Sequence, residues 1–347
     1  MIRRDGGEGW FLISQVDHAH LAAEMVAAWG KPVLPEPACL LPAIRDHDEG
    51  WREWERLPDI DPGTHRPRNF TEMPASEATR IWARSIEICR RGRRSIVDSV
   101  DAFRRFLSLA GLRLSHERAI IAEEVFSSWE AFSAEEILDR LPQRDDGRKV
   151  SRASVYRTLT LMEEARLLRK VSLGTYRDAY EQTHRIGEGS TLAGIWVSRH
   201  FTFLGQRARE HDPAGAAIWA EFLENQKYLQ SQWSAEAQRE YGVHEAKALV
   251  ELGTRWVQFF DLLSLWFCCR ERTETEAFEM PAGEMVHFTP LKSGEVAVEP
   301  FPFSVPELSL QVEAKRMDQK TFADRAEFQA AFDEAESERL EWKIVRW

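Results

Sequence analysis

Residues 132–141 read FSAEEILDRL, a pattern that marks the beginning of a helix near the middle of the chain. Ser133 precedes Glu136 by three positions, so each side chain can accept a hydrogen bond from the backbone N–H of the other in a capping box. Phe132 and Ile137 flank this pair and are available for the apolar contact that often accompanies it. The sequence therefore predicts a helix that begins directly after Ser133.

A second helix and a β-hairpin are expected behind the first. Ser151 is the predicted N-cap of that helix. The apolar residues of its buried face recur at helical spacing and are Val155, Leu159 and Met162. Arg157 lies opposite this face, and Tyr156 lies at its edge. Residues 167–182 read as two strands around residues 173–174. A basic, aromatic-bearing helix followed by a hairpin suits insertion into the major groove of DNA, although a charged helix that is only solvated has the same composition.

Charge is distributed unevenly along the chain. The 347 residues have a net charge of −11, which by itself argues against a nucleic-acid partner. Residues 90–185 nevertheless contain 19 Lys or Arg against 15 Asp or Glu, so the negative charge belongs to the remainder of the chain. Within this segment, residues 148–157 contain basic side chains and no acidic one. The middle of the chain therefore differs electrostatically from its flanks.

The middle segment, roughly residues 101–184, resembles the N-terminal winged-helix domain of the ferric uptake regulator family. The resemblance is carried by residues 111–118 (GLRLSHER), 132–141, 150–159 (VSRASVYRTL), 163–168 (EEARLL) and the hairpin behind them. It implies that Tyr156 contacts bases, that Arg157 contacts bases or phosphates, and that Arg113 reaches the minor groove or the backbone. Arg152, on the same helix, is a further candidate. The implied partner is double-stranded DNA.

Behind the hairpin the chain departs from that family. Its members continue into a metal site rich in His and Asp and into a dimerisation domain. Here His184 leads directly into RIGEGS, residues 185–190. The resemblance therefore does not imply iron sensing, and any homodimer would have to form through the rest of the chain.

The two flanks predict one domain that the middle segment interrupts. A hairpin is expected over residues 1–15 around DGGEG, followed by helices at 17–29, 38–48, 75–91, 191–210, 214–236 and 244–269. Alternating strands are expected at 286–291, 295–301, 308–314 and 340–347. The expected fold class is α+β: a mainly helical host with terminal β-strands, residues 1–94 and 188–347, interrupted by a winged helix-turn-helix domain at 95–187.

The flanks also resemble known families. Residues 15–20 (QVDHAH), 45–54 (RDHDEGWREW), 69–73, 198–201, 260–265 and 291–302 are similar to a bacterial family known as a domain of unknown function. The constellation is similar as well to the HD superfamily of metal-dependent phosphohydrolases, whose ligands follow the order His, His-Asp, Asp. The residues in that order are His18, His47, Asp48 and Asp261. Imidazole and carboxylate groups suit divalent manganese, iron, magnesium or zinc, and an open coordination position can activate water against a phosphate ester.

Each candidate residue also has a structural interpretation. A single histidine such as His18 or His47 is more often a core or capping residue than a ligand. Asp261 interrupts an apolar helix, where a buried carboxylate costs several kcal/mol unless it is paired with an Arg or coordinates a metal. Glu49 could support a ligand or act as a general base, and His200 could serve a second metal or orient a phosphate.

Two functions from different classes fit these patterns. The leading one is a DNA-binding transcriptional regulator whose HD-like domain senses a metal or a small-molecule ligand. The alternative is a metal-dependent phosphohydrolase that carries the winged helix as a targeting module, and a protein-binding role for the winged helix is a third interpretation. No apolar run is long enough for a membrane span and the start lacks signal-peptide features, so the sequence predicts a cytoplasmic protein with no membrane partner.

Overall fold

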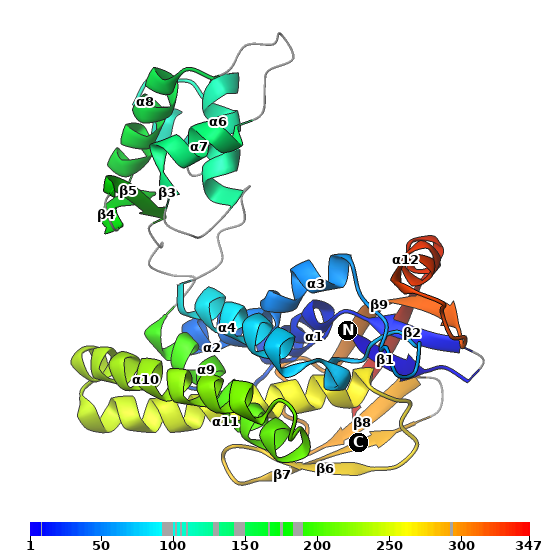
Figure 1. The fold of residues 1–347 in the computed structure, drawn as a ribbon. Helices are drawn as coiled ribbons and strands as arrows, with labels where there is room; N and C mark the ends of the chain where they lie inside the picture. The colour runs from blue at the N-terminus through cyan, green and yellow to red at the C-terminus, as the bar shows by residue number, and fades with distance from the viewer. Residues whose placement is uncertain are drawn as a thin grey trace. The chain divides into compact units, whose positions relative to one another are not determined.

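The chain divides into two compact units, residues 1–91 with 189–347 and residues 92–188 (Figure 1). The computed structural model describes every residue except 8, 92–99, 101–102, 105, 109, 128–131, 142–149, 166, 174–175, 183–189 and 292–293. The domain boundaries expected at residues 95 and 187 lie outside the described residues, as do Gly174 and His184. Helices and strands are both abundant, so the fold class is α+β, as expected.

Helices make up most of the first unit. The long ones are α1 (Gln15–Ala27), α2 (Pro37–Asp46), α4 (Ala75–Arg91), α9 (Thr191–His211), α10 (Ala216–Tyr241) and α11 (Val243–Cys268). The short ones are η1 (Glu49–Trp51), α3 (Arg52–Arg56), η2 (Phe70–Glu72) and α12 (Arg325–Glu334). The six expected helices are confirmed to within a few residues at each end, whereas α12 was not expected. None of the described helices is long and apolar enough to cross a membrane.

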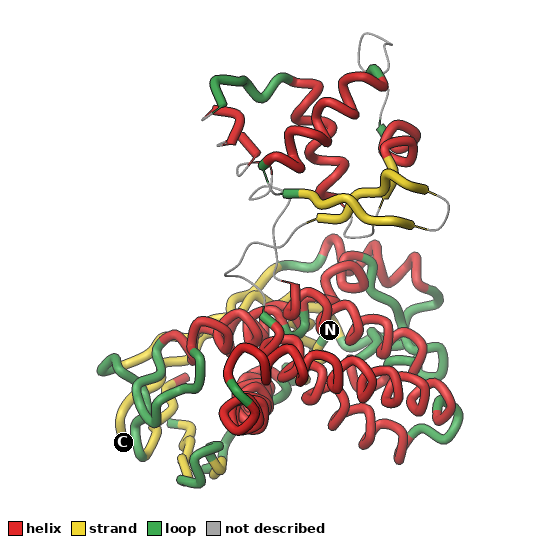
Figure 2. The backbone as a smooth tube through the Cα atoms, turned by 90° about the vertical axis from the view of Figure 1, so that its left-hand side faces the viewer, coloured by secondary structure: helices red, strands yellow, loops and turns green. Residues whose placement is uncertain are grey.

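The strands of the first unit form one sheet that lies beside the helices (Figure 2). They are β1 (Ile2–Asp5), β2 (Gly9–Ile13), β6 (Glu276–Glu279), β7 (Met285–Pro290), β8 (Glu295–Glu299), β9 (Glu307–Asp318) and β10 (Ser337–Arg346). Their order is β1-β2-β9-β10-β8-β7-β6, and the pairing is antiparallel except between β10 and β8. Buried and exposed residues alternate along β9, as expected for a strand with one face on the core.

A close approach between α9 and α11 sets the geometry of the helical layer. The indole N–H of Trp196 on α9 donates to the carbonyl of Leu249 on α11 at 2.9 Å. Gly253 faces the same indole, and a Cβ at this position would lie 2.1 Å from the Trp196 ring. His200 follows Trp196 by one helical turn, and Asp261 follows Gly253 by about two. The packing at Gly253 therefore fixes the spacing of two candidate site residues.

The second unit has its own apolar core. It contains α6 (His116–Ser127), α7 (Ala134–Arg140), α8 (Arg152–Glu164) and a sheet of order β3-β5-β4, with β3 at Phe132–Ser133, β4 at Leu168–Leu173 and β5 at Tyr176–Gln182. The capping box of Ser133 and Glu136 is confirmed, and the Ser151 side chain caps α8 as expected. The predicted apolar face of α8 is fully buried at Val155, Leu159 and Met162.

Candidate metal centre and nucleic-acid interface

Four polar side chains from the two flanks of the sequence converge in the first unit. They are His18, His47, Asp48 and Asp261, and each offers a ligand atom within 4.8 Å of the others. The Nε2 atoms of His18 and His47 each lie 3.1 Å from Oδ1 of Asp261. The same two nitrogens lie 3.6 and 3.7 Å from Oδ2 of Asp48. The structure therefore brings together all four residues that the sequence singled out.

The local structure explains how each side chain reaches this place. His18 lies in the first turns of α1, which Ser14 caps by accepting hydrogen bonds from two backbone N–H groups. His47 caps the C-terminus of α2, and Asp48 follows it at the start of η1. Asp261 lies on the buried face of α11. Three helices and one helical turn thus supply the four groups.

Hydrogen bonding orients the histidine rings. Nδ1 of His47 lies 2.7 Å from the carbonyl oxygen of Ile44, which assigns a proton to this nitrogen and leaves Nε2 facing Asp261. A bond of this kind, from the second ring nitrogen to a carbonyl, is common for histidines that bind metals. Nδ1 of His18 is buried and has no hydrogen-bond partner among the described residues. Two imidazole nitrogens directed at one carboxylate oxygen require a proton or a cation between them.

The pKa values show how strongly these groups depend on one another. Burial raises the pKa of Asp261, but hydrogen bonds from His18 and His47 outweigh it and hold the pKa well below its ordinary value. Burial lowers the pKa of His47, whereas Asp48 and Asp261 together raise it to about 9. For Asp48, burial dominates and raises the pKa. The cluster is therefore a buried, anionic environment that holds positive charge.

The donor spacing fits a bound divalent cation. Bonds of about 2.0–2.2 Å from a cation to nitrogen and oxygen place neighbouring donor atoms about 3.0–3.5 Å apart. The separations of 3.1–3.7 Å between the histidine nitrogens and the carboxylate oxygens come close to this range. A set of two imidazoles and two carboxylates suits manganese, iron or zinc. The His/Asp cluster is thus arranged so that it can hold a metal.

Two residues of the cluster, Asp48 and Asp261, line a pocket of about 400 Å³, called here the His200 pocket. His200 lines the pocket as well, and its Nε2 lies 3.5 Å from Oδ2 of Asp261. Burial lowers the pKa of His200 to about 4, so its ring is neutral at pH 7. The walls are aromatic and are formed by Trp51, Phe70, Trp82, Phe201 and Trp219.

Two basic residues of this pocket were not expected from the sequence as site residues. Arg207 and His211 line it, and both belong to α9. They follow His200 by 7 and 11 positions, so the three residues lie on one face of the helix. This periodicity of polar residues is visible in the sequence and could have identified them.

The remaining candidates of the first unit have other partners. The carboxylate of Glu49 is buried and forms an ion pair with Arg52, and Glu49 does not line the described part of the His200 pocket. Among the described residues, the ion-pair partners of Asp261 are histidines and not an arginine. The alternative explanation, in which Asp261 pairs with a buried Arg, therefore finds no such Arg among the residues that the structure describes.

The candidate DNA-contacting residues lie on the surface of the second unit. Arg152, Tyr156 and Arg157 are exposed on α8, and Arg113 is exposed just before α6. Arg152 forms an ion pair with Glu135 of α7. The hydroxyl of Tyr156 donates to the same carboxylate at 3.1 Å. The side chain of Glu135 thus interacts with two of the candidate DNA-contacting residues.

These observations describe a two-unit α+β protein with a candidate metal centre in one unit and an exposed basic helix in the other. The chain belongs to the family described as "Protein of unknown function (DUF3891)", whose model matches residues 1–94 and 116–319. It is also 27% identical over 86 residues to the ferric uptake regulation proteins of Campylobacter jejuni and Campylobacter upsaliensis. This similarity covers 25% of the chain and 55% of each relative, so the chain spans about half the length of the curated relatives it matches.

Proposed function

We propose that the protein is a DNA-binding regulator in which a winged helix reads DNA and a divalent-metal centre in the other unit senses a metal or a small ligand. The observation that carries the proposal is the exposed face of α8, where Arg152, Tyr156 and Arg157 lie together. It is supported by the partial similarity to ferric uptake regulation proteins. We place the winged-helix domain at residues 95–187, inserted into a host domain formed by 1–94 and 188–347.

The chemistry of α8 suits duplex DNA. Its solvent face offers guanidinium groups for phosphates and an aromatic hydroxyl for a base edge, and a helix of this size fits the major groove. When DNA binds, Arg152 and Tyr156 must break their contacts with Glu135 and form contacts with the nucleic acid instead. Since Glu135 is exposed, this exchange carries little desolvation cost.

Fluorescence anisotropy with labelled duplexes of several sequences, at two or more salt concentrations, tests DNA binding. Arg157→Ala should weaken binding to every duplex and reduce the salt slope by about one if the residue contacts phosphate. Tyr156→Ala should instead reduce the difference in binding affinity between duplexes of different sequence. Arg339→Ala removes an equal charge from β10 and is the matched control. A folded protein that binds no duplex at low salt would overturn the proposal.

A metal-dependent phosphohydrolase similar to the HD superfamily is the second candidate. It is favoured by the opening of the His/Asp cluster into the His200 pocket, which has Arg207 and His211 further along the same helix face. His18, His47, Asp48 and Asp261 would hold the cation, whose contribution would be to lower the pKa of a bound water and polarise a phosphoryl oxygen. The neutral His200 can orient a phosphate, and Arg207 can neutralise its charge.

Metal content and turnover distinguish the two candidates. The full chain, purified without chelator, is assayed for bound metals and for hydrolysis of phosphate esters and nucleotides. Turnover that disappears in His47→Ala and is weakened in Arg207→Gln supports the hydrolase. Bound metal without turnover on any of these substrates favours the sensor.

A further inference from the structure

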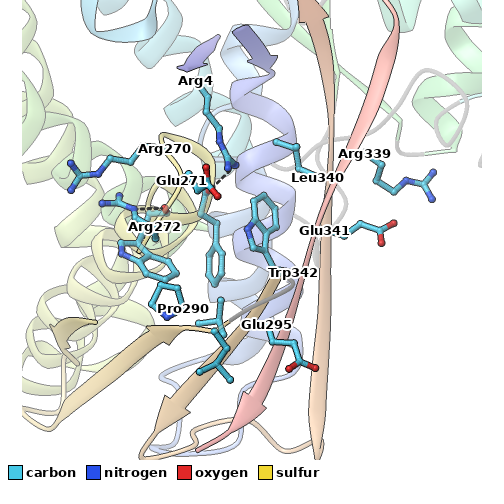
Figure 3. A pocket seen from close by; sticks show the side chains of 15 residues that line it. Arg4, Arg270, Glu271, Arg272, Pro290, Glu295, Arg339, Leu340, Glu341 and Trp342 are labelled. Atoms are coloured by element: carbon cyan, nitrogen blue, oxygen red, sulfur yellow. Dashed lines mark hydrogen bonds between the residues drawn. The ribbon is translucent and has the colours of Figure 1, made fainter. Parts of the chain in front are cut away.

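A second pocket of the first unit concentrates arginines against aromatic rings. It has a volume of about 260 Å³ and lies between the C-terminal end of α11 and strands β1, β8 and β10 (Figure 3). Its basic residues are Arg4, Arg270, Arg272 and Arg339, and its aromatic residues are Trp266, Phe267 and Trp342. We call it the arginine pocket. None of its residues belongs to the His/Asp cluster.

Arg4 is a partly buried cation that makes few direct polar contacts. Its Nε is buried and has no hydrogen-bond partner among the described residues. Its Nη1 makes one long hydrogen bond, 3.4 Å, to the carbonyl oxygen of Phe267. No carboxylate of the described residues forms an ion pair with it, although Glu271 lines the same pocket. Burial lowers the pKa of Arg4. A guanidinium in this position loses hydration that one long hydrogen bond replaces only in part.

Aromatic faces surround the Arg4 guanidinium. Its Cζ lies 6.0 Å from the ring centres of both Phe11 and Trp342. Cation–π contacts of this kind hold the planar group in place but leave its N–H donors available. The side chain is therefore oriented without being neutralised.

Arg272 reaches the pocket from the segment that follows α11. Its Nε donates to the carbonyl oxygen of Trp266 at 2.9 Å, and its Cζ lies 5.4 Å from the Trp266 ring centre. Burial lowers the pKa of Arg272, and the nearby charges of Arg270 and Arg4 contribute to this effect while Glu276 opposes it. Like charges are thus held near one another, which favours an anion that several of them can share.

The other charged residues of the pocket do not neutralise the positive charge of Arg4 and Arg272. Arg339 pairs with Glu313 at 2.9 Å, and in Figure 3 Arg339 and Glu341 point away from Arg4. Glu276 lies 3.4 Å from Arg272 and also accepts a hydrogen bond from the Trp266 indole. Glu271, whose charge raises the pKa of Arg4, lines the pocket with Arg4 and Arg270, so two guanidinium groups share one carboxylate there and a net positive charge remains.

We propose that the arginine pocket binds a small organic oxyanion, a phosphate or carboxylate attached to a planar apolar body, with Arg4 and Arg272 as its charge partners. The planar guanidinium of Arg4 matches the geometry of carboxylate and phosphate oxygens. The rings of Trp266 and Trp342 supply flat apolar walls for the body of the ligand. The volume is slightly below the range of about 300–1,000 Å³ that is usual for drug-sized ligands, so the ligand is small.

Isothermal titration of the full chain at low salt, with phenyl phosphate, benzoate and inorganic phosphate as probes, tests the proposal. Phenyl phosphate or benzoate should bind saturably and more tightly than inorganic phosphate. Arg4→Gln should weaken that binding by a factor of about ten to a hundred, the value of a charge-assisted hydrogen bond. Arg4→Lys, which keeps the charge and loses the planar fork, should lie between Arg4→Gln and the wild type. Arg316→Gln, which removes an equal charge from an exposed position on β9 outside the pocket, is the matched control and should leave binding unchanged.

Other outcomes would overturn the proposal. They are an absence of saturable binding for all three probes, equal binding by folded Arg4→Gln and wild-type protein, and equal affinity for inorganic phosphate and phenyl phosphate. Because phosphate could also bind at the His/Asp cluster, the titration is repeated with Asp261→Asn. Binding that Asp261→Asn abolishes and Arg4→Gln leaves intact belongs to the cluster and contradicts the proposal.

Discussion

Replacing Asp261 with Asn tests whether Asp261 binds a metal or has only a structural role. The substitution keeps the shape of the side chain and removes the charge toward which His18 and His47 converge at 3.1 Å. A metal at a hundredfold excess over its Kd stabilises the folded protein by about 2.7 kcal/mol. In a protein of this size each kcal/mol shifts the Tm by about 2–4 °C. Removal of the metal should therefore lower the Tm of the wild type by about 5–10 °C and leave the Tm of Asp261→Asn almost unchanged.

The assay combines metal analysis of the purified protein with thermal unfolding before and after treatment with a chelator. Asp318→Asn removes the same charge from an exposed position at the end of β9 and is the control. If Asp261→Asn retains the metal content and the chelator-dependent Tm shift of the wild type, Asp261 is not a ligand. If the wild type contains no metal and its Tm does not respond to added manganese, iron or zinc, the metal centre itself is refuted.

Three further predictions concern other parts of the molecule. Glu135→Gln should raise DNA affinity about two- to fivefold in anisotropy titrations, because it removes the acid that competes for Arg152; unchanged or weaker affinity would contradict this. Although burial lowers it, neighbouring carboxylates raise the pKa of His47 to about 9, so a metal must displace a proton below that pH. Metal affinity, measured by chelator competition, should therefore fall by up to about tenfold per pH unit as the pH decreases from 8 to 6, and a flat profile would exclude His47 as a ligand. Gly253→Ala should destabilise the protein by about 1–3 kcal/mol in urea unfolding because its Cβ would overlap Trp196, whereas Gly205→Ala, whose Cβ would meet its nearest neighbour at 3.4 Å, should be neutral or stabilising.

Local signals in the sequence were sufficient for most helices and strands. The helix over residues 75–91 has the predicted bounds, and the capping box at Ser133 forms as expected, because caps and apolar periodicity act within a few residues. The hairpin around DGGEG is also confirmed by the pairing of β1 with β2. Among the elements that escaped prediction, β6 buries only Phe278 and α12 buries only Phe328. Short elements with a single buried residue leave little periodicity to detect.

The order of the strands could not be predicted from local patterns. β2 pairs with β9, about three hundred residues away, and β10 pairs in parallel with β8. Each strand displays its own alternation, but alternation does not identify the partner. Partners are selected when strands from both ends of the chain pack on the same helices, which is a property of the whole unit.

The sequence by itself determined the candidate ligand types and their order, because His18, His47, Asp48 and Asp261 stand in a pattern typical of metal sites. Only the tertiary structure decided that these four meet, through the packing of α1, α2 and α11. It also places the Glu49 carboxylate in an ion pair with Arg52, while the role of Glu49 as a general base stays a prediction. The arginine pocket belongs wholly to the tertiary structure, since β1 and the segment after α11 bring Arg4 and Arg272 together across more than 260 positions. The sequence specifies the chemistry of each side chain directly, whereas the distance between residues that are remote in the sequence depends on the packing of the entire core.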